Sequence, residues 1–121
     1  MSIASEALTG VGLWITRRER KQDRDDAAVR SVLTAVNATK RYLAGRDRGE
    51  AINRATEAEL VELWTTASVH IRRTDTNLAV RLLLKADYWT NPENWSAEDI
   101  DGNRIQIDEI AQEGQRLLSA P

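Results

Sequence analysis

The stretch that decides the fold runs from Asp75 to Trp89 and reads D-T-N-L-A-V-R-L-L-L-K-A-D-Y-W. At helical pitch, apolar side chains cover most of its circumference. One face carries Leu78, Leu82, Ala86 and Trp89. A helix that is apolar nearly all round belongs inside a helical domain, where neighbours contact it on several sides.

One narrow polar stripe interrupts this helix, and it is the most specific candidate site in the sequence. The stripe consists of Asn77, Arg81, Lys85 and Tyr88, at spacings of three or four residues. If it lines a groove, two cations and two hydrogen-bonding side chains converge on a space suited to a phosphate or carboxylate. We add Lys40 to this predicted anion site, as a cation from a neighbouring helix.

Two other interpretations of these cations remain open. The stripe is either the solvent-exposed edge of a buried helix, or it is neutralised internally by Glu59 or Glu62, at a cost in desolvation. Lys40 falls on an apolar helix face, one turn after Val36. Its stem then covers apolar surface while its amine reaches water.

A second helix precedes the quoted stretch closely. Thr56 and Glu59 have the spacing of a capping box, which predicts a helix start at Thr56. The apolar face that follows ends near Arg72, so about five residues join the two helices. A connection that short predicts a central antiparallel hairpin of helices at about 56–72 and 75–90.

Apolar spacing predicts further helices on both sides of this hairpin. They cover a segment beginning at Ser2, a second segment from Val29 to Leu43, and a last one from about Ile107. The run Arg17–Asp26 is polar all round and is either a helix extension or a loop. We therefore predict an all-α fold, a compact bundle of four to five helices in a single domain over residues 1–121.

Tryptophan usage indicates an interaction surface. The chain has four tryptophans and no phenylalanine, and Trp14, Trp89 and Trp95 lie near predicted helix ends. Large amphipathic rings are typical of binding hot spots. With the neighbouring cations Arg17 and Arg18, these tryptophans are the candidate contacts with a partner.

Composition excludes several classes of chemistry. The absence of cysteine removes disulfides and thiolate sites, and a single histidine, His70, removes multi-histidine metal sites. No catalytic, phosphate-loop or calcium-loop motif is complete, and no nucleophile can be argued beside His70. We expect no metal, no cofactor and no catalysis. No segment is long and apolar enough for a transmembrane helix, and the chain reads as cytoplasmic.

Charge is distributed unevenly along the chain. Residues 1–48 carry ten Lys/Arg and six Asp/Glu, a net charge of +4. Residues 49–121 carry seven Lys/Arg and thirteen Asp/Glu, a net charge of −6. Such a distribution steers charged partners, including a second copy of the chain. The leading hypothesis is a non-catalytic protein–protein interaction module, as an adaptor, accessory subunit or self-associating domain. Anion or nucleotide binding by the stripe is the alternative, and nucleic-acid binding by the Arg17–Arg24 cluster ranks third.

Overall fold

The computed structural model describes the backbone of residues 3–120 and the side chains of residues 20–120. It contains five α-helices and one short 3-10 helix, and no strand occurs within residues 3–120. The elements are α1 (Ile3–Asp47), α2 (Arg54–Ile71), α3 (Thr76–Thr90), η1 (Pro92–Asn94), α4 (Ala97–Gly102) and α5 (Ile107–Ser119). The predicted all-α class and the number of helices are confirmed.

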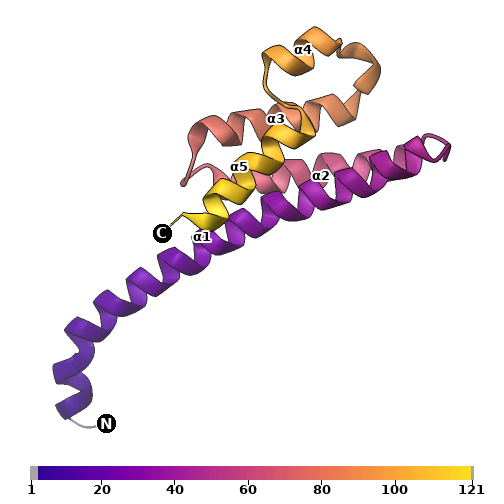
Figure 1. Cartoon of the computed structure of the whole chain (residues 1–121). Coiled ribbons are helices and arrows are strands. Elements are labelled where there is room, and N and C mark those ends of the chain that lie inside the picture. Colours follow the sequence, from indigo (N-terminus) through magenta and orange to yellow (C-terminus); the bar gives the residue numbers. More distant parts are fainter. Residues whose placement is uncertain (1–2, 121) are drawn as a thin grey trace.

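α1 is a single continuous helix of 45 residues, roughly 68 Å long at the standard helical rise. The polar run Arg17–Asp26 is therefore a helix extension, and the two helices expected in this half of the chain are one. Among residues 20–47 of α1, whose side chains the structure describes, the buried positions begin at Ala28. Figure 1 shows the N-terminal part of α1 projecting beyond the other helices, so the molecule as a whole is less compact than the predicted bundle.

α2 and α3 form the predicted antiparallel hairpin, packed closely along their lengths. α2 begins earlier than the capping-box spacing predicts. The side chain of Asn53 is its N-cap and accepts a hydrogen bond from the backbone N–H of Thr56. Asp75 caps α3 in the same way, by accepting from Leu78 N at 2.9 Å. The two caps fix both helix starts. At the end of α3, the backbone N–H of Asn91 donates to the carbonyl oxygens of Asp87 and Tyr88.

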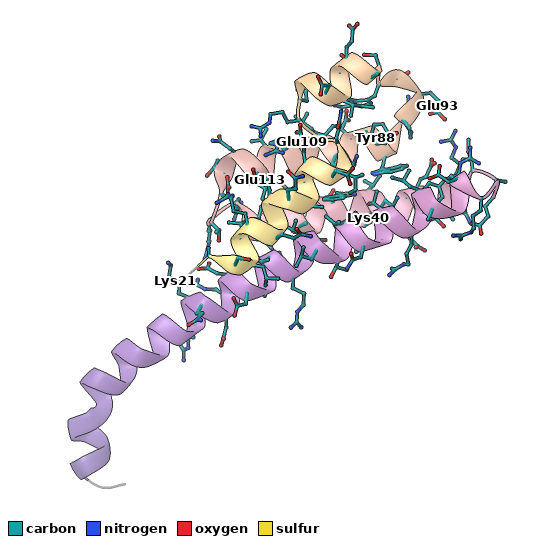
Figure 2. All side chains as sticks on the ribbon, viewed as in Figure 1. Lys21, Lys40, Tyr88, Glu93, Glu109 and Glu113 are labelled. Carbon is teal, nitrogen blue, oxygen red and sulfur yellow. The ribbon has the colours of Figure 1, made fainter. Side chains whose placement is uncertain are left out.

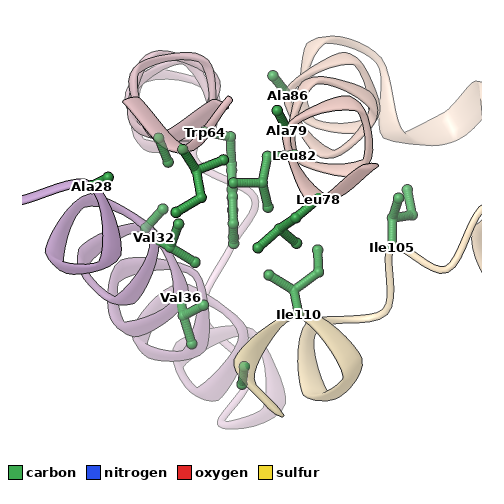
Figure 3. Packing of buried hydrophobic residues seen from close by; sticks show 14 of the residues in the cluster. Ala28, Val32, Val36, Trp64, Leu78, Ala79, Leu82, Ala86, Ile105 and Ile110 are labelled. Atoms are coloured by element: carbon green, nitrogen blue, oxygen red, sulfur yellow. The ribbon is translucent and has the colours of Figure 1, made fainter. Parts of the chain in front are cut away.

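The buried core lies between α1, α2, α3 and α5, and Trp64 stands at its centre (Figure 3). The Trp64 ring is fully buried, and its Nε1–H donates to Thr39 Oγ1 at 3.0 Å. The Thr39 hydroxyl in turn donates to the carbonyl of Ala35 at 2.8 Å. These two hydrogen bonds satisfy the indole N–H of Trp64 and the hydroxyl of Thr39 inside the apolar core. A threonine is therefore accommodated at a buried position that an apolar residue would otherwise occupy.

α3 is less enclosed than its sequence indicates. Its inner face is buried as predicted, but Val80 and Leu83 are 56% and 55% exposed. The helix packs against α2 along its length, while α1 contacts both α2 and α5. The expectation that several neighbours surround α3 is therefore wrong for its outer face.

α5 crosses α1 at Gly114. A Cβ atom at this position would lie 3.0 Å from Leu33 Cδ2 and 3.4 Å from Val32 Cγ1, closer than ordinary packing allows. The missing side chain lets the two helix backbones approach, and Ile110 enters the core one turn earlier. The sequence between α3 and α5 turns through α4, which begins with a capping box formed by Ser96 and Asp99.

Candidate functional site

The four residues of the predicted stripe on α3 differ in their exposure to solvent. Asn77 is exposed, Arg81 and Tyr88 are half-buried, and Lys85 is 5% exposed. Lys40 is exposed on α1, so its amine reaches water as the snorkelling interpretation expects. Neither of the two hollows described below is lined by Lys40 or by a residue of the stripe, and the anion site remains a prediction.

Arg81 is held by its own chain. Its Nε donates to the carbonyl oxygen of Arg104 at 3.0 Å, and its Nη2 lies 3.9 Å from Glu109 Oε2. Arg104 Nε lies 3.7 Å from the same carboxylate oxygen. Glu109 on α5, rather than Glu59 or Glu62, therefore neutralises Arg81, but it forms no ion pair with Lys85.

Lys85 is the most unusual charged residue among the described side chains. Its amine lies 4.9 Å from the ring centroid of Tyr88 and 6.0 Å from that of Trp89, and it makes no ion pair with a described residue. Burial lowers the pKa of Lys85 from 10.5 to about 8. The amine is thus buried under aromatic rings with only cation–π contacts to favour its charge.

The rings of Tyr88, Trp89 and Trp95 lie together around the C-terminal end of α3, and we call this cluster the aromatic corner. The Tyr88 ring meets the rings of Trp89 and Trp95 edge to face, at centroid distances of 4.8 and 6.2 Å. Trp89 is 4% exposed and Trp95 is half-buried. Of the predicted contact residues whose side chains the structure describes, Trp95 is partly exposed and Trp89 is not. The side chains of Trp14, Arg17 and Arg18 lie outside the described residues.

A polar cluster around the buried Glu57 adjoins this corner. The Tyr42 hydroxyl donates to Glu57 Oε2 at 2.7 Å and accepts from the backbone N–H of Asn53 at 3.0 Å. Arg54 donates to the other oxygen of Glu57 at 2.7 Å and pairs with Glu93. Burial, followed by the hydrogen bond to Glu57, raises the pKa of Tyr42. Each carboxylate oxygen of Glu57 has a partner, so this cluster joins α1, α2 and the start of η1 structurally.

A surface groove lies between α1 and the C-terminal end of α2, with a volume of 390 Å³. We call it the basic groove. Its floor is apolar, and its rim is mostly cationic. The lining residues are Lys21, Arg24, Asp25, Ala27, Val69, His70, Arg72 and Arg73.

The cations of the basic groove are only partly neutralised. Lys21 Nζ lies 3.9 Å from Asp25 Oδ2, and Asp25 also accepts a hydrogen bond from the hydroxyl of Thr74. The arginines Arg24, Arg72 and Arg73 are exposed and form no ion pair with a side chain that the structure describes. Three guanidinium groups thus surround a floor that includes Val69, which is 52% exposed.

A second hollow of 490 Å³ continues the groove along the α1–α2 seam, and shares Ala27 and His70 with it. Here Ser31 Oγ lies 3.4 Å from His70 Nδ1. No local pattern points to this pair, because 39 residues separate its members. A hydrolytic site also needs a carboxylate bonded to the histidine and donors for an oxyanion. No hydrogen bond or ion pair of His70 with a carboxylate is found among residues 20–120, so the pair is a cross-helix contact.

No known protein family, characterised protein or solved structure matches this chain. Between residues 3 and 120, no helix combines the length and the apolar character needed to cross a membrane. The described side chains also contain no group of three or more histidines and carboxylates placed to hold a metal ion.

Proposed function

We propose that this protein is a non-catalytic helical interaction module that binds an acidic segment of a protein partner in the basic groove. The observation that carries the proposal is a set of three arginines, Arg24, Arg72 and Arg73, which form no ion pair with a described side chain and lie around the exposed apolar side chain of Val69. Arginine pairs well with carboxylates, and it is enriched at protein interfaces.

The mixed character of the groove favours a protein over a nucleic acid. Asp23, Asp25 and Asp26 interrupt the cations of α1, so the groove offers a long phosphate backbone no continuous basic track, whereas a short segment with few carboxylates can contact the arginines alone. The groove floor is apolar, which suits a side chain of a peptide. A partner with one apolar or aromatic residue between carboxylates matches both the floor and the rim.

The test measures binding of a short fluorescent peptide, in which glutamates flank one tryptophan, by fluorescence anisotropy. We expect the double variant Arg72→Gln, Arg73→Gln to weaken binding by about tenfold, as expected for the loss of two exposed charge contacts. The matched control is Lys40→Gln, Arg41→Gln, which removes two adjacent exposed cations elsewhere on α1. Equal weakening by both variants would contradict the proposal, because only net charge would then matter.

A single-stranded oligonucleotide of equal charge is the competing probe. Tighter binding of the oligonucleotide than of the peptide would replace this proposal with nucleic-acid binding. Absence of binding to either probe at low salt would leave the basic groove without a charged ligand and would overturn the proposal.

A further inference from the structure

Four exposed acidic residues lie close together in the chain at the end of the molecule away from the basic groove. Glu93, Glu98, Asp99 and Asp101 lie on η1 and α4, and all are exposed. We call this segment, residues 93–101, the acidic tip. In Figure 2, Lys21 marks the groove end of the bundle and Glu93 marks the tip, at opposite sides of the view.

The charges of the acidic tip are mostly unpaired. Glu93 pairs with Arg54, but Glu98, Asp99 and Asp101 form no ion pair with a described cation. Asp99 is used locally, since its carboxylate accepts from the backbone N–H of Ser96. Asp101 accepts a hydrogen bond from Gln106 Nε2 at 3.3 Å through one oxygen, so Glu98 and the other oxygen of Asp101 remain available for contacts outside the chain.

The acidic tip also carries an aromatic centre. Trp95 is half-buried between Glu93 and Glu98 in the sequence, and its ring packs on Tyr88 at one edge. The tip thus combines one partly exposed aromatic residue with exposed carboxylates before and after it in the chain. This is the chemistry that an apolar floor with an arginine rim accepts, because arginine stacks on aromatic faces and pairs with carboxylates.

The geometry points to a second copy of this chain as the occupant of the basic groove: the acidic tip of one molecule binds the basic groove of the next. This inference rests on the proposed function and names the partner. Charge complementarity carries it, because three unpaired arginines at one end of the bundle match unpaired carboxylates around Trp95 at the other. The contact joins two different surfaces, so it is heterologous, and one molecule can make it at both ends.

The first measurement is mass in solution, by size-exclusion chromatography with light scattering, over a concentration series of the full chain. We expect the mass to rise with concentration at about 25 mM salt and to fall toward the monomer at about 300 mM, where exposed charges are screened. A monomer at every concentration in low salt would overturn the inference.

Charge reversal then locates the contact. The groove variant Arg72→Glu, Arg73→Glu and the tip variant Glu98→Lys, Asp101→Lys are each expected to be monomeric at concentrations where the unchanged chain associates. Mixed in equal amounts, they should associate again, since each keeps one intact surface and the two altered surfaces are themselves complementary. The control Lys40→Glu, Arg41→Glu should associate like the unchanged chain.

Circular dichroism melting establishes that each variant is folded, and Arg24→Glu, Arg73→Glu replaces the groove variant if it does not fold. Failure of the mixture to associate would overturn the inference, as would association of either variant alone. The peptide experiment separates the two proposals. Peptide binding by a chain that stays monomeric removes the second copy as occupant and leaves the proposed interaction module intact.

Discussion

Replacing Lys85 with methionine should stabilise the protein at neutral pH. The two side chains have similar volumes, so the substitution removes the charge while largely keeping the packing against Tyr88 and Trp89. Lys85 is 5% exposed and has no anionic partner among the described residues, so a charged amine here has lost most of its hydration. The methionine carries no such cost.

The magnitude follows from the change in pKa. Lowering the pKa of Lys85 from 10.5 to about 8 corresponds to about 3 kcal/mol of free energy between the charged and neutral forms. The cation–π contacts with Tyr88 and Trp89 favour the charged form by about 1 kcal/mol. We therefore expect Lys85→Met to raise the free energy of unfolding by about 2 kcal/mol at pH 7, and the melting temperature by about 8 °C.

The sign of the pH dependence distinguishes this cause from ordinary repacking. The pKa in the folded state lies below the value in the unfolded state, so between pH 8 and pH 10.5 the unfolded chain binds more protons. The stability of the unchanged protein should therefore rise with pH through this window. The penalty is complete below pH 8 and absent above about pH 10.5. The advantage of Lys85→Met should shrink over the same window.

Urea unfolding followed by tryptophan fluorescence measures both quantities at several pH values. The comparison is between variant and unchanged chain at each pH, so titration of the tyrosines cancels. Lys40→Met, at an exposed lysine, is the control and should leave the pH dependence unchanged. A Lys85→Met chain no more stable than the unchanged one at pH 7, or an advantage independent of pH, would refute the reasoning.

Three further substitutions test the polar contacts of the bundle by urea unfolding. Thr39→Val removes the acceptor of the Trp64 indole N–H inside the core and should cost about 1–3 kcal/mol, whereas a cost near zero would mean that the indole finds another acceptor. Tyr42→Phe breaks the hydrogen bonds with Glu57 and the Asn53 backbone and should cost about 1–2 kcal/mol; an unchanged midpoint would contradict a structural role for this cluster. Asn53→Ala removes the α2 cap and should cost about 1 kcal/mol, while an equal loss on replacing Thr56 alone would favour the predicted capping box.

The helical architecture is predictable because its signals are local. The hairpin follows from one short connection with an apolar face on either side, and the structure confirms it. Local signals also compete, and this explains the misplaced start of α2. Asn53 lies three residues before Thr56 and is an equally good cap, and the apolar spacing alone does not choose between them.

Errors in the predicted packing come from polar residues with partners distant in the sequence. The apolar spacing includes Lys40 in the inner face of its helix with its amine in water, whereas the structure exposes Lys40 and places Thr39 in the core, because Trp64 and Ala35 satisfy the Thr39 hydroxyl. Val80 and Leu83 are exposed for a different reason, because neighbouring helices do not surround the outer face of α3. Helical periodicity shows that a face is apolar, but the number of neighbours around a helix depends on the whole arrangement.

The candidate site illustrates the same limit. The cations of α1 up to Arg24 are visible as a cluster in the sequence, and the groove adds Arg72 and Arg73 from the end of α2, about fifty residues later. Their proximity requires the hairpin to end beside α1. The sequence singled out the stripe on α3 instead, because its residues are close in the chain.

The crossing at Gly114 has a consequence for how the fold opens. Among the helices, α5 packs its backbone closely only on α1, whereas α2 is packed on both α1 and α3. Its remaining attachments include the exposed ion pair of Arg116 with Asp75 and the contacts of Glu109. In hydrogen–deuterium exchange, the amides of α5 should therefore exchange together through a sub-global opening, before those of the α1–α2–α3 unit. A larger residue at position 114 would shift this equilibrium toward the open form, with the hairpin still protected.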